Sequence, residues 1–297
     1  MFTMKKCMAV MFTFLFLTSS TLALADEEEA RSEELSVETS EELLSVEPAA
    51  SPEAMAFVQA TTLPEDDEWH FIAAPYLWVV DTGGTIQIGP IVQEIDLPFS
   101  AILSQLQGAF IMHFEANKKR WGAATDFSYV SSAKGGALQI PLPGGSTASG
   151  DLGIKLLFWE AWPYYRLGEG ASVFDIIGGI RYYRISTELD FSQIGGQTRG
   201  LAIDWVDPIV GGRWIGQVHP KVRLTARADF GGFGAGAELT TNLQGGVAVL
   251  LREKFLLLFQ YRWMDIDYNQ GDAPLNRNFF EYKATSQGAL IGFGFAF

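Results

Sequence analysis

Cysteine and histidine are scarce in this sequence of 297 residues, which has one cysteine and three histidines. The cysteine is Cys7, so the rest of the chain has no disulfide and no thiolate metal site. No group of His, Cys, Asp or Glu has the spacing of metal ligands. The Gly-rich stretch G-G-F-G-A-G (231–236) is not followed by a helical pattern, which favours a hairpin loop over a phosphate loop. We therefore expect no metal and no cofactor.

A basic surface is also lacking. The formal net charge is −14, and the excess of acid lies in one segment, because residues 26–68 hold 15 acidic residues and one basic residue. Residues 69–297 are nearly neutral, with 18 basic and 20 acidic residues. A nucleic-acid partner is excluded, since such a partner requires a basic patch.

Long apolar runs are missing after residue 25. The first 25 residues resemble a secretory signal, with Lys5 and Lys6 before the apolar run A-V-M-F-T-F-L-F-L (9–17) and the small residues A-L-A (23–25) at the cleavage position. That run is shorter than the roughly 20 apolar residues of a membrane-spanning helix. We expect export and cleavage after Ala25.

The acidic segment 26–68 has too few apolar residues to offset the entropy of ordering, so we expect a disordered, solvated linker. A weakly amphipathic helix near residues 33–46 that docks on a partner is the alternative.

Residues 69–297 contain segments in which polar and apolar residues alternate, as in K-V-R-L-T-A-R-A-D-F (221–230). This period of two predicts β-strands. The connectors alternate between tight turns and longer Gly-rich or polar loops. The expected strands are 69–80, 107–117, 120–133, 151–167, 171–188, 201–217, 221–231, 237–251, 254–268 and 278–297.

An even number of strands with tight turns at one end and long loops at the other predicts an all-β fold, a closed antiparallel up-and-down transmembrane β-barrel. About ten strands are expected. Eight or twelve remain alternatives, because residues 84–89 could form a further strand and residues 99–106 look helical.

Three features favour an apolar outer face and a polar interior: the export signal, the balanced charged face, and tryptophans near the ends of strands. The tryptophans expected in interfacial girdles are Trp69, Trp78, Trp121, Trp162, Trp214 and Trp263.

The chain ends in G-F-G-F-A-F (292–297), which resembles the C-terminal signature of Gram-negative outer-membrane β-barrel proteins. The segments W-H-F-I-A-A-P-Y-L-W and W-V-D-P-I-V-G-G-R-W resemble a poorly characterised branch of these proteins. The resemblance implies that Phe293, Phe295 and Phe297 form an insertion signature. It also implies an outer-membrane location, and outer-membrane lipid, the barrel-assembly machinery and periplasmic chaperones as partners.

Charged residues on the presumed inner face are the candidates for lining the lumen. They are Glu115, Asp126, Lys155, Glu160, Asp175, Arg181, Asp207, Arg213, Arg223, Arg227, Asp229 and Arg262. The lumen of a barrel of about ten strands is filled by its own side chains. We therefore expect a structural barrel with a salt-bridged interior, or a narrow porin-like channel for small polar solutes, and no enzyme.

Two alternatives come from other classes. His113 lies in mid-strand with Glu115 on the same face, so a barrel enzyme that acts on lipid or envelope substrates could use it. A soluble periplasmic barrel that binds a ligand would have the two faces inverted.

Overall fold

The computed structural model describes residues 67–132, 136–141, 147–190, 199–252, 254–271 and 279–297. The expected signal peptide and the acidic segment lie outside these ranges, apart from Asp67 and Glu68. Within the described ranges no helix combines the length and the hydropathy of a membrane span. The elements are β1 (His70–Ile88), β2 (Ile91–Leu97), α3 (Phe99–Ser104), β3 (Leu106–Lys118), β4 (Trp121–Ser132), β5 (Gly136–Pro141), β6 (Thr147–Leu167), β7 (Ser172–Asp190), β8 (Arg199–His219), β9 (Val222–Gly232), β10 (Leu239–Arg252), β11 (Phe255–Gln270) and β12 (Phe280–Ala296).

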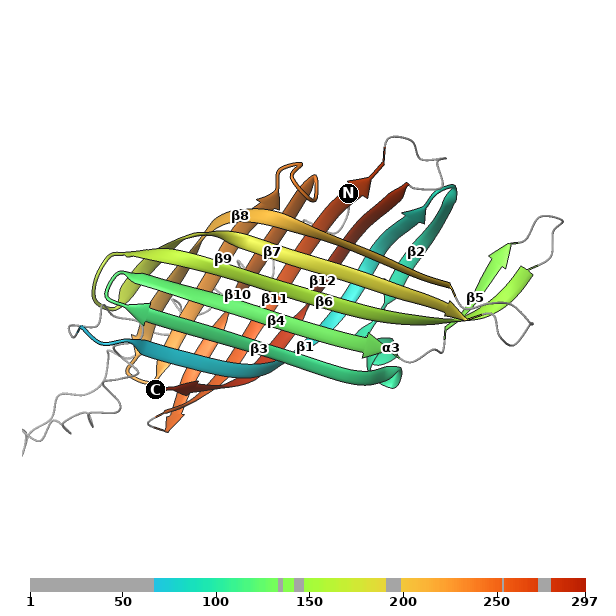
Figure 1. The fold of residues 1–297 in the computed structure, drawn as a ribbon. Helices are drawn as coiled ribbons and strands as arrows, with labels where there is room; N and C mark the ends of the chain where they lie inside the picture. The colour runs from blue at the N-terminus through green and yellow to red at the C-terminus, as the bar shows by residue number, and fades with distance from the viewer. Residues whose placement is uncertain (1–66, 133–135, 142–146, 191–198, 253, 272–278) are drawn as a thin grey trace, which may run out of the picture. The chain divides into compact units, whose positions relative to one another are not determined.

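The strands form a closed antiparallel barrel (Figure 1). Ten strands make the ring, in the order β1, β3, β4, β6, β7, β8, β9, β10, β11 and β12, and β12 pairs with β1 to close it. Closure pairs each strand of the ring on both sides along most of its length, which a bilayer requires of a spanning sheet. The pairing of β1 with β3 covers residues 70–75 and 112–117, and toward the loop end β1 pairs with β2 instead.

The sequence prediction of ten strands is confirmed, and the alternatives of eight and twelve are wrong for the ring. The structure differs in the connection expected at residues 81–106. There β1 continues to Ile88 and forms a hairpin with β2, and α3 follows where a helical piece was expected. At another long connection, β5 pairs with the first residues of β6. The loop end of the barrel is therefore extended by hairpins, whereas the opposite end, the tight-turn end, carries the short turns.

The C-terminus is fixed at the tight-turn end. The backbone N–H of Phe71 donates to the carbonyl of Phe297 at 2.9 Å, and the N–H of Phe297 donates to the carbonyl of Phe71 at 3.0 Å. The last residue thus completes the ladder between β12 and β1 instead of fraying. Nearby, Lys118 and Lys119 bind the carboxylate of Asp67, and these contacts lower the pKa of Asp67.

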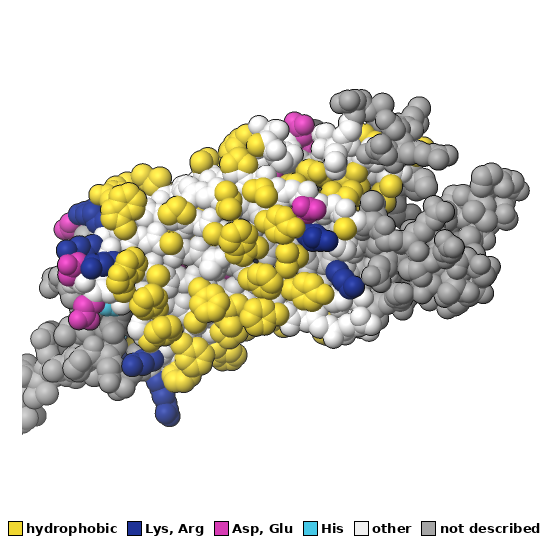
Figure 2. Space-filling view, in the orientation of Figure 1, with side chains coloured by type: hydrophobic (Ala, Val, Ile, Leu, Met, Phe, Trp, Pro, Cys, Tyr) yellow, Lys and Arg dark blue, Asp and Glu magenta, His cyan; other side chains and the backbone are white. Residues whose placement is uncertain are grey.

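The outer face of the barrel is apolar. Large apolar side chains are exposed along the strands, and the three phenylalanines of the C-terminal signature are among them, with Phe293 at 56% exposure. Figure 2 shows apolar side chains spread over the barrel wall, while charged side chains gather toward its two ends. Arginines and carboxylates are buried inside. This is the polarity expected of a membrane barrel, and it is opposite to that of a soluble one.

The close approach of β6 and β7 requires glycine at position 179 but not at position 178. A Cβ atom at Gly179, which faces inward, would lie 2.2 Å from the carbonyl oxygen of Ala161, whereas a Cβ at Gly178 would meet nothing within 4 Å. We expect Gly179→Ala to lower the free energy of unfolding by about 1–3 kcal/mol. Gly178→Ala should change it by less than about 0.5 kcal/mol. Urea unfolding of both variants in lipid vesicles checks this, and equal effects would contradict it.

Candidate functional site

Most of the predicted lumen residues lie inside the ring, and all of these are buried except Glu115, which is partly buried. The structure places there Glu115, Asp126, Glu160, Asp175, Arg181, Asp207, Arg213, Arg223, Arg227, Asp229 and Arg262. They alternate with outward apolar residues, since successive side chains of a strand point to opposite faces. The described residues contain no group of three His, Cys, Asp or Glu that could hold a metal ion.

Glu160 lies at the centre of this interior and is fully buried. Three arginines from three other strands donate to its carboxylate. Arg181 binds Oε2 at 2.6 Å, Arg227 binds Oε1 at 3.0 Å, and Arg262 binds Oε1 at 3.2 Å. One carboxylate therefore joins β6 to β7, β9 and β11.

Two further side chains, Asp229 and Asn242, contact these arginines. Asp229 accepts hydrogen bonds from Arg181 Nη2 at 2.7 Å and from Asn242 Nδ2 at 2.7 Å, and its Oδ2 lies 2.8 Å from Arg227 Nε. Asn242 Oδ1 accepts from Arg262 Nε at 2.8 Å. We call Glu160, Arg181, Arg227, Asp229, Asn242 and Arg262 the Glu160 cluster.

Aromatic rings cover the guanidinium groups of this cluster. The guanidinium carbon of Arg227 lies 3.9 Å from the ring centre of Trp162, and that of Arg262 lies 4.9 Å from the ring centre of Phe158. The negative faces of the rings attract the cations where water is excluded. This compensates part of the cost of removing the charges from water.

A second charged group lies nearer the tight-turn end. Arg213 binds Glu115 through two hydrogen bonds of 2.7 and 2.8 Å, and it also donates to Asp175. Asp175 accepts two more from Arg166, and Tyr164 donates to Glu115 at 2.6 Å. Arg166 is fully buried and was not among the sequence candidates.

His113 lies between two carboxylates in this region. Its Nδ1 is 3.1 Å from Asp126 Oδ1, and its Nε2 is 3.5 Å from Glu115 Oε2. Both ring nitrogens thus face acceptors from the barrel wall, an arrangement that fixes the orientation of the imidazole.

An aromatic cluster fills the lumen toward the loop end. Trp205 stacks on Tyr268 with ring centres 4.1 Å apart and on Tyr183 with ring centres 4.9 Å apart. Phe280 packs against the same group. Asp207, one of the predicted lumen residues, accepts a hydrogen bond of 2.7 Å from the backbone N–H of Ala237, next to the turn between β9 and β10.

Lys155 differs from the prediction, because it is exposed and lies on the outer face. In β6 it is separated by five residues from the inward-facing Glu160. An odd separation in a regular strand places two side chains on opposite faces. Arg166 is separated from Glu160 by six residues and is therefore inward.

The predicted tryptophan girdle is partly wrong. Trp69, Trp121 and Trp214 are exposed at the ends of strands, as expected. Trp162 is buried in the lumen against Arg227, and Trp78 packs inside against the aromatic cluster. These two rings pack in the interior, where Trp162 contacts the buried guanidinium of Arg227 and Trp78 contacts the aromatic cluster.

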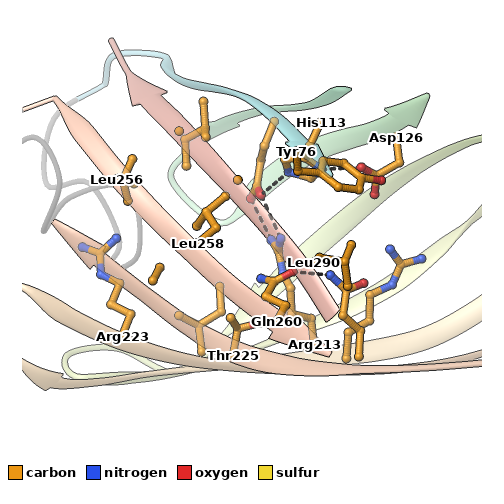
Figure 3. A pocket seen from close by; sticks show the side chains of 18 of the residues that line it. Tyr76, His113, Asp126, Arg213, Arg223, Thr225, Leu256, Leu258, Gln260 and Leu290 are labelled. Atoms are coloured by element: carbon orange, nitrogen blue, oxygen red, sulfur yellow. Dashed lines mark hydrogen bonds and ion pairs between the residues drawn. The ribbon is translucent and has the colours of Figure 1, made fainter. Parts of the chain in front are cut away.

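A cavity of about 150 Å³ remains in the lumen between the Glu160 cluster and the tight-turn end. Arg213, Arg223, Arg227, Glu115 and Asp126 supply its charged lining. Figure 3 shows Arg223 and Thr225 together on one wall, with Leu256 and Leu258 projecting into the same space.

A scan against protein-family models finds no match, and a search of curated proteins finds none either. Among solved structures, the outer membrane protease OmpT from Escherichia coli is similar, with 6% identity over 78% of this chain and 97% of that chain and a TM-score of 0.50. The translocator domain of the autotransporter NalP from Neisseria meningitidis has 14% identity, coverage of 83% and 97%, and a TM-score of 0.38. Ail from Yersinia pestis has 9% identity, coverage of 78% and 100%, and a TM-score of 0.33. The class of protein is thus a closed up-and-down β-barrel, and the resemblance to outer-membrane barrels is confirmed at the level of the fold.

Proposed function

We propose that the chain is an integral outer-membrane β-barrel whose lumen is closed by its own side chains, so that it acts as a structural barrel and not as an open porin. The apolar outer face and the closed ring support the location, since a bilayer requires both. The export signal and the C-terminal phenylalanines agree with it. Outer-membrane lipid, the barrel-assembly machinery and periplasmic chaperones are the partners that this proposal implies.

The observation that carries the closed lumen is the contact between Glu160 and Arg262. Their strands, β6 and β11, are five positions apart in the ring of ten, on opposite sides of the barrel. Arg262 Nη2 nevertheless lies 3.2 Å from Glu160 Oε1. Arg213 of β8 and Glu115 of β3 bridge the lumen again at a second level. A path for solutes would have to cross both levels.

His113 has a positioning role in this proposal. A hydrolytic site would need carboxylates that are available to orient the imidazole and a nucleophile beside it. Here Asp126 does orient the imidazole through Nδ1, but Nε2 faces Glu115 and not a nucleophile. That carboxylate is in turn held by Arg213 and Tyr164. We therefore favour a wall contact over catalysis, and we retain the expectation that the protein is not an enzyme.

Fractionation tests the location. We expect the full chain to sediment with outer membranes and to migrate differently on SDS gels before and after heating, because a closed barrel resists unfolding by detergent. Recovery in the soluble periplasmic fraction without detergent would contradict the proposal.

Liposome swelling tests the closed lumen. Vesicles that contain the refolded barrel should swell in a small sugar such as arabinose no faster than vesicles without protein. A general porin reconstituted at the same protein-to-lipid ratio is the positive control. Swelling at a rate near that of the porin would show an open path and would favour the channel alternative.

A further inference from the structure

The wall of the barrel has an incomplete junction between β1 and β3. Their ladder covers residues 70–75 and 112–117, and beyond it β1 continues into the hairpin with β2, away from β3 (Figure 1). Within the described residues, no strand pairs with the side of residues 76–81 that faces β3, or with the side of residues 106–111 that faces β1. Two sheet edges thus face each other across the wall. We call the opening between them the window.

The window is closed at both of its ends. Toward the tight-turn end it stops at the paired residues Pro75 and Met112. Toward the loop end the chain itself crosses from β2 through α3 into β3, and the backbone N–H of Phe99 in α3 donates to Asp81 of β1 at 2.7 Å. No residue of α3 is buried, so the helix does not pack its side chains into the wall. A ligand of the window would therefore enter from the side.

Lipid-facing side chains surround the window. Leu77 and Phe110 flank it on the outer face and are 46% and 54% exposed. A strand crosses a bilayer in about 9–11 residues, and residues 76–81 are the middle of β1, which begins at His70 at the tight-turn end. The window therefore lies within the bilayer, in the half toward the loop end, where acyl chains are the surrounding medium.

Aromatic side chains stand on the inner side of the window. Tyr76 and Trp78 alternate with Leu77 and point into the lumen, where Tyr76 lines the cavity and Trp78 packs against the aromatic cluster. The indole N–H of Trp78 is buried and has no acceptor within the described part of the chain. The inner side thus offers apolar rings to a hydrocarbon chain and a donor to a polar group.

The two edges require hydrogen-bonding groups from whatever fills the window. Along a strand edge, N–H and C=O groups point to the open side in alternation, and such groups are costly to leave unpaired in hydrocarbon. A peptide strand would supply partners, but it would have to leave through an end of the window, and both ends are closed. A lipid enters from the bilayer without crossing either end.

We propose that the window binds a membrane amphiphile, with an acyl chain between β1 and β3 and with a hydroxyl or amide group paired to the backbone edges. The proposal goes beyond the structural barrel and assigns its wall a lipid site. It rests on the membrane location proposed above, which fractionation tests separately, and it does not depend on the absence of conductance.

Two pairs of cysteines, each in a Cys7→Ser background, test whether the window is open. Ala73 and Phe114 are paired in the ladder, whereas Leu77 and Phe110 would pair if the same register continued. In vesicles we expect Ala73→Cys/Phe114→Cys to oxidise to a disulfide. Leu77→Cys/Phe110→Cys should keep free thiols, because a disulfide requires Cα atoms within about 7 Å of each other. Equal oxidation of both pairs in folded protein would overturn the proposal.

Brominated acyl chains, which quench tryptophan fluorescence at short range, test the occupant. The contribution of Trp78 is the fluorescence of the native chain minus that of Trp78→Phe. Trp162→Phe gives the matched control, because Trp162 also faces inward but is 2% exposed on β6, a strand paired on both sides. In vesicles of phosphatidylcholine with brominated chains, the Trp78 contribution should lose most of its intensity and the Trp162 contribution should keep most of it. Equal losses would contradict the proposal, and the cysteine pairs decide the case if a variant does not fold.

A competitor tests the hydrogen-bonding part of the proposal. Lauroyl ethanolamide carries an amide and a hydroxyl group at the end of its hydrocarbon chain, and dodecane carries neither. When equal amounts are added to the brominated vesicles, lauroyl ethanolamide should restore the fluorescence of Trp78 more than dodecane does. Equal recovery with the two compounds would show that the backbone edges do not select the ligand.

Discussion

Replacement of Glu160 with Gln is expected to lower the free energy of unfolding by about 3–5 kcal/mol, the range measured when one partner of a buried ion pair is removed. The substitution keeps the shape of the side chain and removes its charge. Arg181, Arg227 and Arg262 would then keep three buried positive charges, with Asp229 as the carboxylate that remains within the cluster. Urea unfolding in phospholipid vesicles, followed by heat-dependent gel migration, measures the effect.

Glu169→Gln is the matched control for that measurement. Glu169 also pairs with an arginine, Arg120, but its side chain is 69% exposed, in the turn between β6 and β7. Exposed ion pairs contribute between about 0 and 1 kcal/mol, so this variant should unfold close to the native midpoint. If Glu160→Gln unfolded at the same urea concentration as Glu169→Gln, the Glu160 cluster would not hold the barrel together.

The second large effect is expected on the outer face. Val247 of β10 points outward between Leu224 of β9 and Phe259 of β11, whereas Leu251 lies at the tight-turn end of the same strand. Val247→Arg should lower the free energy of unfolding by about 2–4 kcal/mol if the side chain faces the middle of the bilayer. Leu251→Arg should lower it by only about 0–1 kcal/mol, because an arginine near the interface reaches water.

Measuring both variants in vesicles and in detergent distinguishes an effect of the position of the charge within the bilayer from an effect on the packing of neighbouring side chains. In vesicles the difference between Val247→Arg and Leu251→Arg should be large, and it should shrink in a detergent micelle that lets water approach the charge. Equal effects of the two variants in vesicles would contradict a lipid-facing wall with an apolar band.

The ring and the orientation of its faces could be predicted from the sequence. Strict alternation in residues such as Arg223, Leu224, Thr225, Ala226 and Arg227 defines one charged and one apolar face. In a closed ring with lipid outside, the charged face must point into the lumen. The hairpin of β1 and β2 was harder to predict, because glycine and polar residues between 81 and 90 resemble a loop.

The candidate site was predictable only in part. Counting residues along β6 from Glu160 could have placed three side chains correctly, because side chains at even separations share a face. Trp162 and Arg166 are at even separations and lie inside with Glu160, whereas Lys155 is at an odd separation and lies outside. The nearest charge in its strand, Asp81, would have misplaced Trp78, because a separation of three residues puts the two side chains on opposite faces and Trp78 is the one that packs inside. The contact of Glu160 with Arg262 was also beyond the sequence, because the stagger and tilt of strands around a barrel decide which residues share a level.

The most direct test of the central claim is the conductance of a planar bilayer that contains the native refolded chain. A lumen bridged by Glu160 and Arg262 predicts a baseline without stepwise openings, even at high salt and under applied voltage. The same preparation must show the heat-dependent gel shift, so that a silent recording comes from folded protein. Stable ohmic steps from the folded native chain would contradict the closed lumen and show that the protein is a channel.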